Sequence, residues 1–156
     1  MKFEELGINK DILRVVNEKG FTEPTEIQER SIPVILEGRD VIAGSKTGSG
    51  KTFAFAVPII QKAVKGQGVQ AIVLTPTREL ARQVREEIYD ISKYKKLNVL
   101  AIYGAVSINP QIKKLKHTDV VVGTPGRVLD HLRRGTMKLD NVKVAVLDEA
   151  DRMLDM

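Results

Sequence analysis

Five short apolar runs rich in β-branched residues alternate with stretches of helical period. The runs lie at about 40–44, 70–75, 98–103, 119–123 and 142–147. The clearest helical stretch is 78–93, where Leu80, Val84, Ile88 and Ile91 form one apolar stripe and Arg82 precedes Glu86 by four residues, a spacing suited to an ion pair. Continuously apolar strands that alternate with helices are typical of a parallel sheet covered on both faces. The sequence therefore predicts an α/β fold with a mainly parallel sheet, preceded by two short helices at about 9–19 and 26–36.

The composition fits one domain and suggests an anionic partner. The chain has 156 residues, 42% of them hydrophobic, which is enough for a real core. No run approaches the roughly 18 apolar residues of a membrane span, no signal peptide is evident, and the absence of cysteine fits a cytoplasmic protein. The net charge is +5, but the sequence does not say where on the surface it lies. Aromatic residues are scarce, so a nucleic acid would be held mainly by its backbone.

A glycine-rich turn directly follows the first apolar run. It consists of Ser45, Lys46, Thr47, Gly48, Ser49, Gly50, Lys51 and Thr52. Such a turn between a strand and a helix directs backbone N–H groups at one point and binds phosphate. Lys51 would reach the outer phosphates, and the Thr52 hydroxyl would ligate Mg²⁺. The strict pattern has glycine where this chain has Ser45, and the alternative interpretation is a glycine-rich hairpin followed by a helix.

An acidic segment, Asp148-Glu149-Ala150-Asp151, follows the last apolar run. A carboxylate at the end of a second strand would supply the other protein contact to the metal, and its neighbour could orient a water for attack. We therefore expect Asp148 to ligate Mg²⁺ and Glu149 to position the water. The alternative is a solvated acidic helix start. Together with the phosphate turn, the segment predicts hydrolysis of a nucleoside triphosphate.

Three further loops follow the remaining strands, and parallel strands bring such loops to one edge of a sheet. Their residues offer backbone amides, hydroxyls and two arginines to a phosphodiester backbone. The candidate contacts are Pro76, Thr77, Arg78, Gly104, Thr124, Pro125, Gly126 and Arg127. Helix capping by the two threonines and helix initiation by the two prolines are the alternative roles.

Taken in order, these motifs resemble the N-terminal RecA-like domain of a DEAD-box ATP-dependent RNA helicase, and the resemblance covers essentially the whole chain. Gly20–Gln28 resembles the family's adenine-recognition element, with an aromatic residue upstream at Phe3. Pro76–Ala81 with Gln83, and Thr124–Arg127, are similar to its RNA-contacting motifs, and Asp148–Asp151 gives the family its name. Gly104-Ala105 stands where the family has two glycines, which puts in doubt how closely that loop approaches RNA.

The resemblance implies a P-loop NTPase three-layer sandwich that uses ATP and Mg²⁺. It places Phe3, Phe21, Thr25 and Gln28 around the adenine, although Thr25 and Gln28 also have the spacing of a helix capping box. Lys51, Asp148 and Glu149 become the catalytic residues, and Asp151 is expected to pair with another motif or relay a conformational change. Residues 1–36 would form an N-terminal helical segment, and residues 37–156 the incomplete RecA-like core.

In the family, a strand with a Ser-Ala-Thr motif and a second RecA-like domain follow the acidic motif. Neither is present within these 156 residues, so the chain is expected to be a truncated or split form with weak ATPase activity. The alternatives are a non-catalytic ATP- or RNA-binding module and another phosphate-loop ATPase that acts on nucleic acid. The basic clusters Lys113, Lys114, Lys116 and Arg133, Arg134 are expected to be mostly solvated, and His117 and His131 lack metal-ligand spacing.

Overall fold

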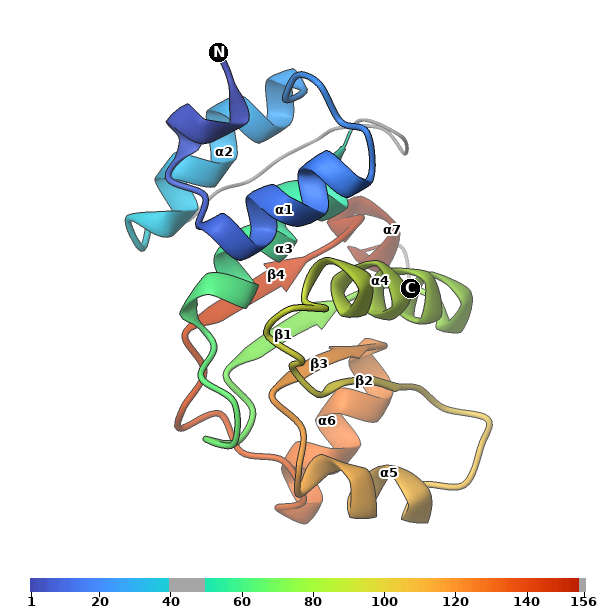
Figure 1. The fold of residues 1–156 in the computed structure, drawn as a ribbon. Helices are drawn as coiled ribbons and strands as arrows, with labels where there is room; N and C mark the ends of the chain where they lie inside the picture. The colour runs from blue at the N-terminus through green and yellow to red at the C-terminus, as the bar shows by residue number, and fades with distance from the viewer. Residues whose placement is uncertain (40–49, 155–156) are drawn as a thin grey trace.

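The computed structural model describes residues 1–39 and 50–154, and within them the predicted parallel sheet is present (Figure 1). Its strands are β1 (Ala71–Leu74), β2 (Val99–Ile102), β3 (Val120–Gly123) and β4 (Val144–Leu147). They pair in the order β2-β3-β1-β4, and all three pairings are parallel. Each strand lies inside a predicted apolar run. The first run, 40–44, and residues 45–49 of the phosphate turn lie outside the described residues.

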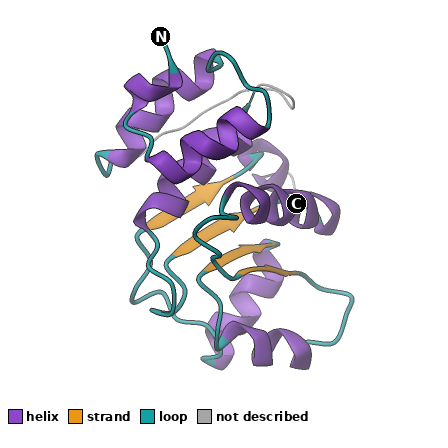
Figure 2. Cartoon of the chain, in the orientation of Figure 1, coloured by secondary structure: helices purple, strands orange, loops and turns teal. Residues whose placement is uncertain are grey.

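The helices form layers on the two faces of this sheet (Figure 2). They are η1 (Phe3–Leu6), α1 (Lys10–Glu18), α2 (Glu26–Leu36), α3 (Lys51–Lys62), α4 (Arg78–Ile91), α5 (Asn109–Leu115), α6 (Pro125–Arg134) and α7 (Ala150–Leu154). The helices α3 and α4 cover one face, with α1 and α2 beyond α3, and α5 and α6 cover the other. The predicted N-terminal helices and the predicted helix at 78–93 are therefore present.

Two apolar clusters separate these layers, and β3 contributes to both. Val120 and Val122 pack against the α3 and α4 side, whereas Val121 faces the α5 and α6 side. All three valines are fully buried. Because successive strand residues point to opposite faces, a strand covered on both sides must be apolar at every position. This explains why the strands appear in the sequence as uninterrupted apolar runs.

The N-terminal segment is fixed to α3 by polar and aromatic contacts. The Gln61 side chain accepts a hydrogen bond from the Asn9 N–H at 2.8 Å and donates one to the Gly7 carbonyl at 3.3 Å. The ring of Phe3 packs edge-on against Phe53, with centroids 5.9 Å apart. These contacts hold residues 1–36 beside the helix that begins at the phosphate turn.

Buried polar side chains close the amino end of the sheet. Asp119 is buried, and its two oxygens accept hydrogen bonds from the N–H groups of Gly66 and Asn98. Gln70 is also buried and bonds to the backbone of Val64 in both directions. The loops at this end are thus held by the protein itself. The opposite, carboxyl end carries the starts of α4, α6 and α7 and most of the predicted functional residues.

Candidate nucleotide and nucleic-acid site

The two segments predicted to share a metal ion meet at the carboxyl end of the sheet. The Lys51 ammonium lies 2.7 Å from Oδ1 of Asp148, although Lys51 begins α3 and Asp148 follows β4. Asp148 is only 4% exposed. The contact is an ion pair without hydrogen-bond alignment, so Oδ1 has no hydrogen-bond partner among the described residues. A buried carboxylate oxygen in this condition is suited to a cation.

The start of α3 is open to an anion. Gly50 precedes the helix in the left-handed conformation, with φ of 84°, and has no side chain with which to cap it. The first N–H groups of a helix have no partner within it, and the helix dipole adds positive character there. Lys51 adds a full positive charge at the same point. The described end of the predicted phosphate turn therefore has the character of a phosphate site.

Gln28 connects the adenine-recognition segment to this turn. The capping box of α2 is present, because Gln28 Oε1 accepts from the Thr25 N–H at 2.9 Å while Thr25 Oγ1 accepts from the Gln28 N–H. The Gln28 Nε2 group also donates to the Gly50 carbonyl at 3.2 Å. One N–H and one lone pair of the carboxamide remain, which is the minimum for recognition of an adenine edge.

The two aromatic residues expected near the adenine differ in exposure. Phe3 is 4% exposed and packs against Phe53, so it is a core residue in this structure. Phe21 also packs edge-on against Phe53 and is 43% exposed. Of these two rings, Phe21 is the one that offers surface to a base.

Thr52 has a neighbour that sequence reasoning did not identify. The pKa of Glu87 on α4 is raised, mainly because the carboxylate is partly desolvated. A hydrogen bond from Thr52 and the charge of Lys19 oppose this shift, and the charge of Asp148 adds to it. Glu87 therefore lies within electrostatic reach of both predicted metal ligands. The sequence showed it as one polar position of an amphipathic helix, and only the packing of α4 against α3 turns it toward the site.

Glu149 is held in an unusual conformation. Its φ is 54°, a left-handed value that non-glycine residues rarely adopt. Its carboxylate lies 3.2 Å from the Arg152 guanidinium, one turn later. Strained backbone of this kind is common at functional sites. Asp151 is exposed at the start of α7.

The loop after β1 combines a capping role with an exposed arginine. Thr77 Oγ1 accepts from the Leu80 N–H at 3.2 Å, so the capping alternative is correct for Thr77. Pro76 is buried. Arg78 is exposed, and its guanidinium lies 5.5 Å from the centre of the Tyr103 ring. Arg78 is thus the residue of this loop that is placed to contact an outside phosphate.

The loop after β3 leaves its threonine uncommitted. Thr124 precedes α6 but forms no side-chain capping bond, so capping does not account for its hydroxyl. Pro125 occupies the first helical turn, as the helix-initiation alternative predicted. Gly126 is exposed. The open start of α6 therefore offers a hydroxyl and backbone N–H groups to a ligand.

Arg127 has a structural role that its sequence position did not reveal. Its guanidinium donates to Gln111 Oε1 and to the Val106 carbonyl, each at 3.1 Å. Gln111 in turn donates to the Tyr103 carbonyl at 3.0 Å. Arg127 thereby holds the loop that contains Gly104 and Ala105, where Ala105 has a φ of 64°. Arg127 was predicted to contact phosphate, but in this structure its guanidinium holds the neighbouring loop in place.

His131 completes this network. It is fully buried, with Nε2 2.9 Å from Gln111 Oε1 and Nδ1 2.8 Å from Thr136 Oγ1. Gln111 Oε1 can only accept, so Nε2 carries the hydrogen. Burial, followed by the charge of Arg127, lowers the pKa of His131. The described residues contain no cluster of three or more histidine, cysteine, aspartate or glutamate side chains that could hold a metal ion.

Comparison with known proteins identifies the family. The family model described as DEAD/DEAH box helicase matches residues 25–156 of the chain, which include every predicted site residue except Phe3 and Phe21. The chain belongs to the DEAD/DEAH box helicase family.

The curated relatives of this DEAD-box chain are longer than it is. A probable ATP-dependent RNA helicase of Methanocaldococcus jannaschii is 50% identical over 157 residues, which cover 100% of the chain and 43% of the relative. The ATP-dependent RNA helicase CshA of Listeria monocytogenes is 53% identical and is covered over 30% of its length. The chain thus spans less than half of the relatives that it matches.

Solved structures confirm the fold. A DEAD box protein from the hyperthermophile Methanococcus jannaschii superposes with a TM-score of 0.96 at 50% identity, covering 100% of this chain and 43% of that one. A Saccharomyces cerevisiae Dbp5 variant bound to RNA and ADP BeF3 superposes with a TM-score of 0.88 at 40% identity, covering 99% and 40%. The described sheet and helices are therefore those of a RecA-like DEAD-box domain, as the sequence predicted.

Proposed function

We propose that this chain is the ATP- and RNA-binding first domain of an ATP-dependent RNA helicase, which uses ATP with Mg²⁺ to remodel or locally unwind RNA. The observation that carries the proposal is the contact of Lys51 with Asp148 at the start of α3. It joins the phosphate-binding element and the metal-binding element, which lie nearly a hundred residues apart in the sequence. The missing partner of such a domain is a second RecA-like domain.

The residues present fit ATP and Mg²⁺. The start of α3, which has no side-chain cap among the described residues, suits an anion together with Lys51. Oδ1 of Asp148 is paired with the Lys51 ammonium and accepts no hydrogen bond from the described residues, so it suits a cation at the same place. Thr52 is on the first turn of α3 and supplies a hydroxyl ligand. When bound, ATP supplies a phosphoryl group for transfer to water, and Mg²⁺ neutralises charge on the outer phosphates.

Each residue then has a definite task. With ATP and Mg²⁺ bound, Lys51 would exchange its contact with Asp148 for a phosphate oxygen, and Asp148 and Thr52 would hold the metal. Glu149 would accept a hydrogen bond from the attacking water and orient it. Gln28 pairs with the adenine edge, and its bond to the Gly50 carbonyl links base recognition to the phosphate turn.

The RNA contacts in this proposal lie along the same edge of the sheet. Arg78, the Thr124 hydroxyl and the N–H groups at the start of α6 donate to the sugar-phosphate backbone, which carries no sequence information. Arg127 and Gln111 keep the loop at Gly104 in position. The proposed ATP site and the proposed RNA edge both lie where helices begin at the carboxyl end of the same sheet. Binding of one ligand there can therefore affect binding of the other.

Two substitutions test the proposal. Lys51→Ala removes the charge that faces the phosphates, so we expect ATP affinity, measured by calorimetry, to fall by at least about tenfold. Glu149→Gln keeps the shape of the side chain but cannot take up a proton, so we expect near-normal ATP binding with turnover reduced on the order of 100-fold in the presence of RNA.

Asp140→Asn is the matched control for the charge change in Glu149→Gln, because Asp140 is exposed in the loop before β4, at the other end of the strand from Asp148. It should change neither quantity. ATP binding that is insensitive to Lys51→Ala would contradict the proposed site. Tight ATP binding with no turnover in either the unchanged chain or the Glu149→Gln variant would instead indicate a non-catalytic module.

A further inference from the structure

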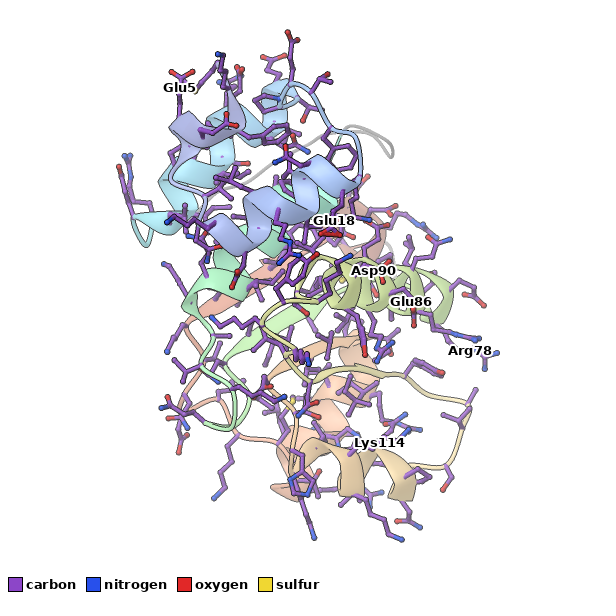
Figure 3. All side chains as sticks on the ribbon, in the orientation of Figure 1. Glu5, Glu18, Arg78, Glu86, Asp90 and Lys114 are labelled. Atoms are coloured by element: carbon purple, nitrogen blue, oxygen red, sulfur yellow. The ribbon has the colours of Figure 1, made fainter. Side chains whose placement is uncertain are left out.

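A groove of about 1050 Å³ runs along the outer side of β2, away from the proposed ATP site. Residues 82–89 of α4 form one wall, and Lys114 on α5 with the residues that follow that helix forms the other; Figure 3 shows Glu86 on the first and Lys114 on the second. Its lining extends along β2 from Asn98 to Tyr103, roughly 16 Å at the rise of an extended strand. None of the motifs identified from the sequence accounts for this surface.

The groove contains the excess positive charge of the chain. Its basic side chains are Lys65, Arg82, Arg85, Lys93, Lys96 and Lys114. Glu86 is the one acidic residue of its described lining. The chain has 25 Lys and Arg residues and 20 Asp and Glu residues. With six of the former and one of the latter in the groove, nineteen of each remain elsewhere. The residues that line this groove therefore account for the whole excess of +5.

Most of that charge is available to an outside ligand. Arg85 pairs with Glu86 at 2.7 Å, and Lys93 pairs with Glu18 on α1. The remaining four cations are Lys65, Arg82, Lys96 and Lys114. They form no ion pair within residues 1–39 and 50–154. Concentrated and uncompensated cations in a concave surface raise the local concentration of anionic ligands.

The floor of the groove argues against a peptide that would add a strand to the sheet. The carbonyl of Val99 accepts from Arg85 Nε at 2.9 Å, and the carbonyl of Tyr103 accepts from Gln111. Both carbonyls face away from β3, because Asn98 and Ile102 are the residues whose carbonyls face it. Side chains thus occupy the outward carbonyls of Val99 and Tyr103, a common protection against strand addition. The six cations of the lining instead indicate recognition by charge.

The groove also continues the proposed RNA edge. Tyr103 lines the end of the groove next to the carboxyl end of β2, and the exposed Arg78 guanidinium lies 5.5 Å from the centre of the Tyr103 ring. We propose that this groove binds the sugar-phosphate backbone of RNA that extends beyond the nucleotides held at the carboxyl end of the sheet. This inference rests on the proposed function, since it assigns the path of a longer RNA. Tyr89 and Tyr103 add aromatic faces at the sides of that path.

The test compares two RNA lengths and two matched sets of substitutions. The groove variant combines Lys65→Gln, Arg82→Gln and Lys114→Gln. The control variant combines Lys113→Gln, Arg133→Gln and Lys138→Gln, three exposed cations outside the groove, so both variants lose the same charge. Affinity for labelled single-stranded RNAs of about 6 and about 20 nucleotides is measured by fluorescence anisotropy at several salt concentrations.

We expect the groove variant to bind the longer RNA on the order of tenfold more weakly, while its affinity for the shorter RNA changes by less than about twofold. The salt dependence of the longer complex should fall by a log–log slope of about 2, because each lost phosphate contact removes about 0.7. The control variant should behave as the unchanged chain does. Thermal unfolding of both variants checks that they are folded.

Other outcomes separate the two proposals. An unchanged chain that binds neither RNA contradicts the proposed function itself. A chain that binds both RNAs, with equal losses in the groove and control variants, contradicts the groove alone. Polyglutamate of similar charge is the competitor that tests a peptide occupant, and displacement of the longer RNA by polyglutamate at equal charge concentration would overturn the assignment to RNA.

Discussion

Gly50 links the adenine-recognition segment to the phosphate site through its backbone. It has a φ of 84°, directly precedes α3, and its carbonyl accepts a hydrogen bond from Gln28. A Cβ at this position would lie 2.8 Å from Thr25 Oγ1 and closer still to Gln28 Nε2. Glycine is therefore required twice over, by the backbone angle and by the approach of the capping box. A single glycine thus sets how closely the proposed adenine-recognition segment approaches the proposed phosphate site.

Gly50→Ala should consequently be much more costly than Gly20→Ala. Gly20 also has a positive φ, 74°, but its Cβ would meet nothing within 4 Å. We expect Gly20→Ala to cost only the backbone penalty, about 1–2 kcal/mol of unfolding free energy. Gly50→Ala should cost roughly 1–3 kcal/mol more, because the capping box must move. Urea unfolding of the two variants measures the difference, and equal losses would show that Gln28 does not pack on Gly50.

At the scale of elements, α5 and α6 are joined to the end of β2 by the network of Arg127, Gln111 and His131. The network satisfies the Tyr103 carbonyl and fixes the loop between β2 and α5. Burial, followed by the charges of Arg127 and Arg134, lowers the pKa of His131 against the opposite effect of Asp130, so the folded chain favours the neutral ring. The interface between two helices therefore depends on the protonation state of one buried ring.

Acidification should weaken this interface. The pKa of His131 is lowered in the folded chain and is near 6.5 when the chain unfolds, so the unfolded state binds the proton more readily. The stability that depends on neutral His131 is thus present above about pH 6.5 and is lost as the pH falls below it. We expect the urea midpoint to decrease between about pH 7.5 and 5.5 in the unchanged chain, and to decrease less in His131→Asn. An identical decrease in both would exclude His131 as the cause.

For the whole molecule, the two edges of the sheet differ within the described residues. Arg85 and Gln111 occupy the outward carbonyls of Val99 and Tyr103 at the β2 edge, whereas β4 pairs only with β1, and Leu147 on β4 is 64% exposed. No described helix is long and apolar enough to cross a membrane. The open side of β4 is where the resemblance to the family places a further strand between β4 and the strand of the phosphate turn.

Hydrogen exchange can test whether this side of β4 is open, because alternate N–H groups of the strand face it. The N–H groups of Val144 and Asp148 face β1, where they donate to the carbonyls of Gln70 and Leu74, so those of Ala145 and Leu147 face outward. We expect the outward amides to exchange on the order of 100-fold faster than that of Asp148. Equal protection of all of these amides would show that another segment pairs with β4.

The fold followed from the sequence because its main determinants are local. Continuous apolar runs predicted all four described strands, and the stripe of Val84, Ile88 and Ile91 predicted the buried face of α4. Residue spacing likewise predicted the capping box at Thr25. The expected pair of Arg82 with Glu86 was wrong, because Glu86 pairs with Arg85, whose guanidinium lies beside it along the edge strand.

Some features of the candidate site were likewise predictable from the sequence, and others were not. Spacing and residue type predicted that Lys51 and Asp148 would meet, since parallel strands bring their carboxyl ends together. Only the tertiary structure showed that Arg127 is held by Gln111, that Phe3 is a core residue, and that the excess charge lies in one groove. Those properties depend on side chains from separate elements, such as Lys65 and Lys114, that come together only when the layers pack. The sequence alone thus determined the elements and the chemistry of their loops, while packing decided which side chains are free to bind.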